Sequence, residues 1–193
     1  MIESLETHEL DRIAQDNTYG FLVLKPDAVE KDLVEIILSH VLCSEPFANH
    51  SEVIDICIMG PITDPNDLRL LYPNLDGDIW EANRQLFASE WSVIALLKSD
   101  GFNICEELTR IKGKVNKDPD AHGLQEGIRG LIPTIGEKDN FINIRKKKES
   151  GETLNQKNLF SLVRNLAHTP DTREEKYAIL QLMKKYTDEK CCL

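Results

Sequence analysis

The feature that most constrains the fold is a short apolar run at residues 19–24, which ends directly at Lys25-Pro26-Asp27. An apolar run of this length, bounded by turn residues, is typical of a β-strand, and proline ends it because proline lacks the amide proton that another ladder bond needs. Apolar residues then recur at helical spacing over residues 29–42, and the acidic Asp27 suits the positive N-terminal end of such a helix. The chain is therefore predicted to open with a strand that leads into a helix.

The rest of the chain continues this alternation of strands and helices. Further strands are predicted at residues 53–59 and 91–97, and helices at residues 64–72, 80–88, 103–112 and 171–186. The return to apolar residues at 159–167 is interpreted as a fourth strand, and the loop at 113–127 is long enough to suggest a function. This order predicts an α+β domain, in which helices pack on one face of a mainly antiparallel sheet.

Composition excludes several classes of protein. A chain of 193 residues with 41% hydrophobic content can bury the core of one domain, and its net charge of -10 argues against a surface that coats nucleic acid. No apolar run reaches the roughly 18 residues of a membrane span, and the N-terminal segment lacks a signal-peptide pattern. Five scattered cysteines without C-x-x-C spacing indicate reduced thiols. We expect a cytoplasmic protein that binds neither membranes nor nucleic acids.

Three segments place a histidine or a cation at the end of an apolar stretch. Lys25 follows the first predicted strand, Arg129 stands in Ile-Arg-Gly at residues 128–130, and His168 closes Asn-Leu-Ala-His at residues 165–168. A folded sheet could bring these three side chains around one anionic ligand, and a histidine so placed can be a nucleophile. Together the segments suggest phosphate chemistry.

The chain resembles nucleoside diphosphate kinases. The resemblance rests on Leu-Lys-Pro-Asp-Ala-Val-Glu-Lys at residues 24–31, on residues 128–130, and on residues 165–168 followed by Asp171, which occur in the order of the family. It implies a ferredoxin-like antiparallel sheet with helices packed on it. The implied organisation is an N-terminal extension at 1–17, a nucleoside diphosphate kinase-like domain at 18–187 with an insertion at 131–158, and a C-terminal tail at 188–193.

The resemblance also implies a mechanism. His168 would take the γ-phosphoryl group of a nucleoside triphosphate and hand it to a nucleoside diphosphate, so that covalent catalysis splits one transfer into two steps. Lys25 and Arg129 match family cations that surround the phosphates, where fixed positive charge lowers the barrier. Arg110 would fill the role of a further phosphate-facing arginine, although strict spacing from the third strand places Thr109 or a neighbour there.

Three other residues match family positions around the nucleotide. Tyr72 corresponds to a tyrosine near the catalytic histidine, and Trp80 to an aromatic residue that stacks on the base. The alternative for Trp80 is a core aromatic on an amphipathic helix, because it shares an apolar stripe with Phe87. Asn165 would donate to the ribose hydroxyls, and otherwise it is a plain turn former.

The departures from the family pattern concern the same site. Val115 stands where the family places a threonine hydroxyl on the phosphate, and Thr169-Pro170 replaces Gly-Ser after the histidine. Ile179 falls near the place of an acidic residue that supports the histidine in the family. These departures leave open a catalytically weak nucleotide-binding or interaction module of the same fold, or an enzyme narrowed to one unusual acceptor.

The expected ligands follow from the same resemblance. There is no P-loop pattern and no zinc spacing, so the expected metal is Mg²⁺ held mainly by the phosphates of the nucleotide and by water. Nucleoside triphosphates and diphosphates are the expected partners. Because family members usually form hexamers or tetramers, a homo-oligomer is expected as well.

Overall fold

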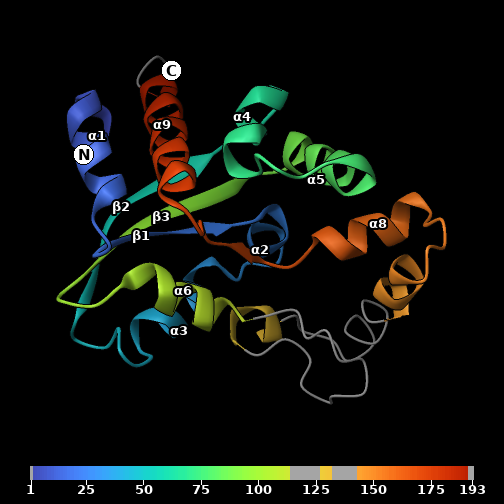
Figure 1. Ribbon diagram of the computed structural model, residues 1–193, viewed down its shortest axis with the longest axis horizontal. Coiled ribbons are helices and arrows are strands. Elements are labelled where there is room, and N and C mark those ends of the chain that lie inside the picture. Colours follow the sequence, from blue (N-terminus) through green and yellow to red (C-terminus); the bar gives the residue numbers. More distant parts are fainter. Residues whose placement is uncertain (1, 114–126, 132–142, 191–193) are drawn as a thin grey trace.

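Four strands form an antiparallel sheet at the centre of the structure (Figure 1). The computed structural model describes residues 2–113, 127–131 and 143–190. The strands are β1 (Tyr19–Leu24), β2 (Ser51–Met59), β3 (Ser92–Ser99) and β4 (Ala167–His168), and they lie in the order β2-β3-β1-β4. Every neighbouring pair is antiparallel. This order, with helical crossovers after β1 and β3, is the ferredoxin-like arrangement, so the predicted fold class is confirmed.

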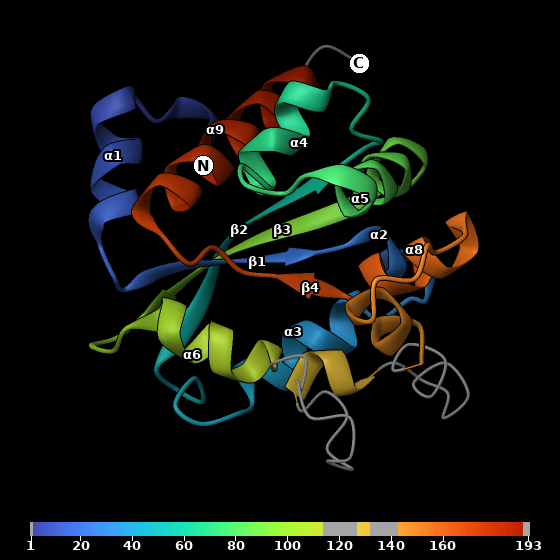
Figure 2. The ribbon, with the colours of Figure 1, turned by 45° about the vertical axis from the view of Figure 1, so that its right-hand side comes forward.

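Helices connect and cover the strands. They are η1 (Ile2–Ser4), α1 (Thr7–Gln15), α2 (Pro26–Glu30), α3 (Val34–Leu42), α4 (Pro65–Leu71), α5 (Gly77–Ser89), α6 (Ile104–Lys112), η2 (Gly127–Leu131), α8 (Gln156–Val163) and α9 (Arg173–Lys190). Residues 143–149 are helical too. In Figures 1 and 2, α1, α4, α5 and α9 lie on one side of the sheet, and α3 and α6 lie on the other.

The prediction that helices cover only one face of the sheet is wrong. The first core lies beneath α1, α4, α5 and α9 and takes from the central strands Phe21, Val23, Ile94 and Leu96. The second core lies beneath α3 and α6 and takes from the same strands Leu22, Leu24, Ala95 and Leu97. Consecutive strand residues point to opposite faces, so a strand that is apolar throughout needs cover on both sides.

Two elements differ from their predictions. The helix predicted at 29–42 is broken between α2 and α3, where Asp32 has a φ of 56°, a conformation that aspartate tolerates in turns. The fourth strand, predicted at 159–167, shrinks to the two residues of β4, because α8 takes the apolar residues before it. The side chain of Asn155 caps α8 by accepting from the amide of Asn158. Short apolar runs fit either structure, and here the helix is favoured by the cap.

The N-terminal segment, predicted as an extension at residues 1–17, packs into the first core. Ile2, Leu10 and Ile13 are buried there beside α9. The Ile2 amide donates to the Asp55 carboxylate of β2 at 3.1 Å, and the Lys184 ammonium of α9 donates to the Leu5 carbonyl at 2.6 Å. The segment therefore seals one edge of the core, while the division of the chain at residues 17 and 187 stays a prediction.

Several expectations fall in parts of the chain that the structure does not describe. The predicted loop at 113–127 is described only at its two ends, and Val115 lies outside the described residues. The predicted insertion at 131–158 is described at residue 131 and from residue 143 onward. None of the described helices is long and apolar enough to cross a membrane.

A glycine substitution tests the close packing between η2 and α6. A Cβ added at Gly127, where φ is +72°, would lie 1.8 Å from the carbonyl oxygen of Ile111, whereas one at Gly101, where φ is +88°, has no neighbour within 4 Å. Gly101→Ala should lower the free energy of unfolding by about 1 kcal/mol, through backbone strain alone. Gly127→Ala should lower it by roughly a further 1–3 kcal/mol because backbone must also move. Equal losses in urea unfolding would contradict this close approach.

Candidate functional site

The pairing of β4 with β1 brings two distant motifs to one end of the sheet. Strand β4 lies beside β1 (Figure 2), with Val23 opposite His168 and Leu24 opposite Ala167. Residues directly opposite each other in antiparallel strands share a face, so His168 lies on the face of the first core, together with Val23. Lys25 follows β1 without a gap. A nucleophile candidate and a cation candidate separated by most of the chain thus become neighbours.

Tyr72 joins this cluster from the C-terminal end of α4. Its ring centroid lies 4.9 Å from that of His168, and the Lys25 ammonium lies 5.7 Å from the Tyr72 centroid. Phe87 of α5 packs edge-on against Tyr72, with centroids 6.0 Å apart. The three residues predicted to be catalytic, His168, Lys25 and Tyr72, are therefore gathered in one place.

The Lys25 side chain is 2% exposed and is held between α5 and α8. Its ammonium donates to the Asn83 carboxamide oxygen at 3.1 Å and to the Val163 carbonyl at the end of α8. Asn83 is oriented in turn, because its amide nitrogen donates to the Ile79 carbonyl at 2.9 Å. A buried ammonium requires such acceptors, since desolvation without them is costly. Sequence reasoning missed Asn83, which reads as one polar residue within an amphipathic helix.

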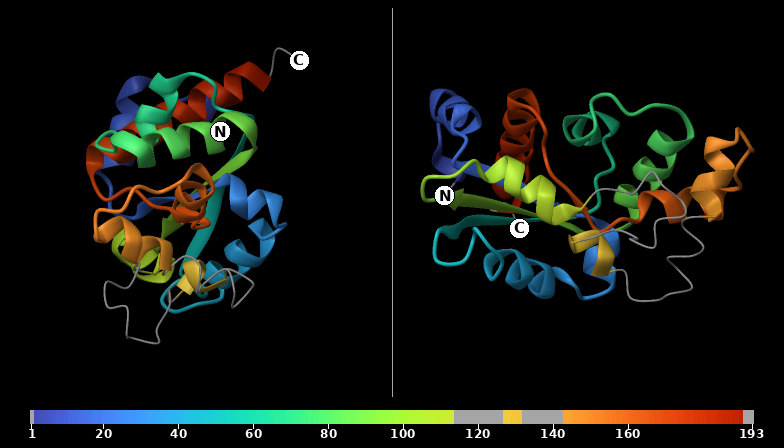
Figure 3. Two further views of the ribbon diagram at one scale, coloured as in Figure 1. Left: turned by 90° about the vertical axis from the view of Figure 1, so that its right-hand side faces the viewer. Right: turned by 60° about the horizontal axis from the view of Figure 1, so that its bottom comes forward.

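Helix α8 lies against α5 beside this lysine (Figure 3). Val163 is buried with Ala82 and Leu86 of α5, and Leu159 and Phe160 pack on the same cluster. The Gln156 side chain of α8 also donates to the Gln85 side chain of α5 at 2.7 Å. Helix α8, which begins at the end of the predicted insertion and continues beyond it, thus forms one wall of the site.

A strained turn precedes the histidine. Leu166 has a φ of +65°, and the Ala167 amide donates to the Asn165 carbonyl at 2.8 Å, which closes a γ-turn. Such a backbone costs about 1–3 kcal/mol for a residue other than glycine. The Leu166 amide donates to the Asp27 carboxylate at 3.0 Å, and the Lys25 amide donates to the Leu166 carbonyl at 2.8 Å. Lys25 and Asp27, which follow β1, therefore bind both the carbonyl and the amide of Leu166.

Asp27 is 1% exposed, and burial raises the pKa of its carboxyl group, against the opposing effects of the Lys25 charge and the Leu166 hydrogen bond. One carboxylate oxygen accepts from Leu166, and the other has no hydrogen-bond partner among the described residues. The sequence indicated only that Asp27 suits the start of a helix. Its contact with Leu166 depends on strand pairing, which local pattern does not reveal.

Trp80 lies on α5, half-buried against the first core. The guanidinium carbon of Arg69 lies 3.7 Å from its ring centroid, a cation–π contact on one face of the indole. Arg69 is fixed by its bonds to the Leu75 carbonyl and to the Asp76 carboxylate. A stacked base would therefore have to use the other face of Trp80 or displace Arg69, and the role of Trp80 stays a prediction.

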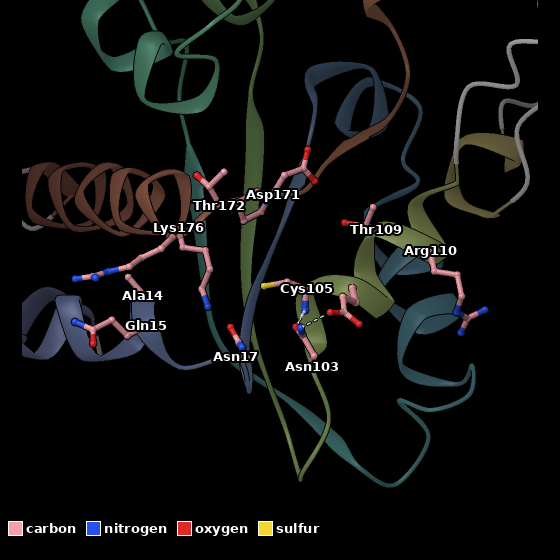
Figure 4. Close-up of a pocket in the computed structure, with 13 residues that line it drawn as sticks. Ala14, Gln15, Asn17, Asn103, Cys105, Thr109, Arg110, Asp171, Thr172 and Lys176 are labelled. Atoms are coloured by element: carbon pink, nitrogen blue, oxygen red, sulfur yellow. Dashed lines mark hydrogen bonds between the residues drawn. The ribbon is translucent and has the colours of Figure 1, made fainter.

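Arg110 is not brought to the histidine. Its guanidinium donates to the Glu107 carboxylate and to the Glu45 carbonyl, both at 2.6 Å, and Figure 4 shows it pointing to a different side of α6 from Thr109. The contacts to the segment after the histidine come from Thr109, whose hydroxyl lies 3.3 Å from that of Thr169, and from Lys112, whose ammonium donates to Thr169 at 2.6 Å. Lys112 is thus a buried cation that sequence reasoning missed.

The other predicted site residues are placed less completely. Arg129 lies in η2, but its side chain is not among the described parts of the structure. Asn165 is half-buried at the start of the γ-turn. Ile179, which falls near the place of the acidic residue in the family pattern, is fully buried in the first core. Within the described residues, no three His, Cys, Asp or Glu side chains gather to hold a metal ion.

A separate hollow of about 780 Å³ lies between α1, α6 and the N-terminal end of α9 (Figure 4). Its lining includes Asn17, Cys105 and Lys176, but none of the three clustered residues Lys25, Tyr72 and His168. Burial lowers the pKa of Lys176, whose ammonium donates to the Asp16 carbonyl at 2.7 Å, and burial raises the pKa of the Cys105 thiol. The hollow is therefore distinct from the cluster around His168.

Comparison with known proteins bears on the fold. No family model matches the sequence, and no curated protein matches it. The structure is similar to a nucleoside-diphosphate kinase from Borrelia burgdorferi, solved as a transition state mimic with bound vanadate and ADP. The TM-score is 0.55 and the identity 12%, over 85% of this chain and 84% of that chain. The chain has a nucleoside diphosphate kinase-like fold.

The raised pKa of Asp27 predicts a pH dependence of stability. Between the ordinary value of 3.8 and the raised value, the folded state binds a proton that the unfolded state releases. The contribution of Asp27 to the free energy of unfolding therefore falls as pH rises through this interval, and the loss is complete above the folded pKa. Asp27→Asn cannot ionise, so its stability relative to the wild type should increase with pH. A difference that stays constant from pH 4 to pH 8 in urea unfolding would contradict the burial of a charge.

Proposed function

We propose that this protein is a phosphotransferase that moves the γ-phosphoryl group of a nucleoside triphosphate to a nucleoside diphosphate through a phosphohistidine at His168. The observation that carries the proposal is the cluster of His168, Tyr72 and Lys25, with the two rings 4.9 Å apart and the ammonium 5.7 Å from the tyrosine ring. The similar kinase structure, with its bound vanadate and ADP, supports a nucleotide as the ligand.

The proposed chemistry consists of two matched half-reactions. A neutral imidazole nitrogen of His168 attacks the γ-phosphorus, a P–N bond forms, the bond to the bridging oxygen breaks, and the nucleoside diphosphate leaves with that electron pair. The second diphosphate then attacks the phosphohistidine and regenerates the imidazole. Magnesium enters as part of the substrate, held by phosphate oxygens and water rather than by a protein cage.

Lys25 would stabilise the charge that spreads over the phosphoryl oxygens. Its ammonium now donates to the neutral Val163 carbonyl and to the neutral Asn83 carboxamide. Bonds to anionic oxygens are about twice as strong as bonds between neutral groups, so a bound phosphate would compete well for this ammonium. Nucleotide binding would then require a local shift at the end of α8.

His168→Gln tests the nucleophile. Incubation of the wild type with [γ-³²P]ATP and magnesium should produce an acid-labile, alkali-stable phosphoenzyme, because phosphohistidine has this stability pattern, and the variant should produce none. His40→Gln, at an exposed histidine on α3, is the matched control and should label as the wild type does. Equal labelling of His168→Gln and the wild type would refute the proposed intermediate.

A second candidate is a nucleotide-binding or interaction module of the same fold that lacks turnover. It is favoured by the burial of Lys25 beneath α8 and by Arg110, which binds Glu107 and Glu45 away from the cluster. Calorimetry with MgADP, alongside the labelling experiment, separates the two. Binding without phosphoenzyme selects the module, and binding with phosphoenzyme selects the enzyme. A screen of diphosphate and monophosphate acceptors then tests whether the enzyme is narrowed to one unusual acceptor.

We also propose that the protein forms a homo-oligomer through the edge strand β2. Ile56 and Ile58 of β2 are each 47% exposed, and within the described chain this strand pairs only with β3. An edge with open backbone groups and apolar side chains is a ready surface for another strand.

Ile58→Lys should weaken the proposed assembly, because it buries a charge against the second copy. The wild type should sediment as an oligomer that dissociates on dilution, and the variant should be monomeric at concentrations where the wild type is assembled. Retention of the folded state, checked by circular dichroism, is the control. An unchanged sedimentation coefficient in the variant would place any interface elsewhere.

A further inference from the structure

The backbone amide and the backbone carbonyl of Leu166 are both bound by the segment that follows β1. Its amide donates to the Asp27 carboxylate at 3.0 Å, and its carbonyl accepts from the Lys25 amide at 2.8 Å. The Lys25 contact uses backbone, so any residue other than proline would make it. The Asp27 contact uses a side chain and is therefore specific to this residue.

The γ-turn that Asp27 stabilises has an unfavourable backbone conformation at Leu166. Leu166 is fully buried and has a φ of +65°, where a leucine side chain is strained. Without an acceptor from Asp27, its amide would be left unpaired in the interior, a state that buried amides avoid. The turn would relax toward extended backbone, and Ala167 and His168 directly follow it.

We propose that Asp27 is a positioning residue for His168: its carboxylate holds the strained γ-turn at Leu166, so that the imidazole stays against Tyr72 and beside Lys25. This inference rests on the proposed phosphotransfer and names a residue on which that site depends. Asp27 acts on the position of His168 through the backbone amide of Leu166.

The surroundings of Asp27 favour an oxygen acceptor for the Leu166 amide, whereas burial disfavours the charge of the carboxylate. One oxygen is taken by Leu166, while the charge of Lys25 acts on the group as a whole. An asparagine has the same shape and keeps one oxygen acceptor for the Leu166 amide, whereas an alanine keeps none. The two substitutions therefore separate loss of the acceptor from loss of the charge.

The experiment compares Asp27→Ala, Asp27→Asn and Asp67→Ala in the full-length protein. Asp67 is a matched control, because it is also a buried aspartate, 7% exposed, but it binds Lys185 of α9 and does not contact the γ-turn. The measured quantities are the rate of phosphoenzyme formation at saturating MgATP, the Kd for MgADP, and the hydrogen exchange rate of the Leu166 amide.

Asp27→Ala should form phosphoenzyme on the order of 100-fold more slowly, as expected for a misplaced nucleophile, with a nearly unchanged Kd and faster exchange at Leu166. Asp27→Asn should restore most of the rate and the slow exchange. Asp67→Ala should react as the wild type does, even though it is less stable. A wild-type rate in Asp27→Ala, an equal loss in Asp67→Ala, or no rescue by Asp27→Asn would overturn the proposal.

A further readout keeps this inference separate from the proposed function. Because its centroid lies 4.9 Å from that of His168, the Tyr72 ring should shift the NMR signals of the His168 ring, which are assigned by their loss in His168→Gln. If the wild type forms no phosphohistidine, the phosphotransfer proposal fails. The signals of the His168 ring still report the position of the imidazole relative to Tyr72. They should move in Asp27→Ala and stay in place in Asp27→Asn. Unmoved signals in Asp27→Ala would overturn the positioning role, whatever the activity.

Discussion

The site depends on the pairing of the two-residue strand β4 with the end of β1. Two residue pairs, Val23 with His168 and Leu24 with Ala167, place the histidine on the face of the first core. A strand this short has little ladder of its own, so its position relies on the bonds of the preceding turn to Lys25 and Asp27. The strained residue Leu166 is therefore also the one whose backbone bonds attach β4 to the residues after β1.

Helix α8 covers the Lys25 side chain, a feature of the site that the short sequence motifs do not indicate. Its last residue, Val163, accepts a hydrogen bond from the Lys25 ammonium and packs between Ala82 and Leu86 of α5. The cation proposed to meet phosphate is consequently covered by protein. A phosphotransferase and a nucleotide-binding module with this site would both need the end of α8 to move before phosphates reach Lys25. For the Lys25 ammonium, the phosphate oxygens would compete with two neutral acceptors already in place, the Asn83 carboxamide and the Val163 carbonyl.

Much of the framework could be predicted because strands and helices carry strong local patterns. β1 coincides with the apolar run at 19–24, and β2, β3, α4, α5, α6 and α9 lie where alternation or helical spacing indicated. Residues 159–167 were harder, since Leu159, Phe160 and Val163 suit a helix as well as a strand, and the Asn155 cap together with their contacts with α5 favours the helix. The cover on both faces of the sheet was missed, although strands that are apolar throughout, such as β1, need cover on both sides.

By itself, the sequence determined which chemical groups are present and in which order: an apolar strand ended by Lys25, a tyrosine at 72, and a histidine after a short apolar stretch. Tertiary structure alone decided that these three meet, that Arg110 turns to Glu107 and Glu45, and that Asn83 and Asp27 support Lys25 and Leu166. The reason is physical. Periodicity encodes the face of an element on which a residue lies, whereas contacts between elements depend on strand register and helix packing, which many distant residues set together.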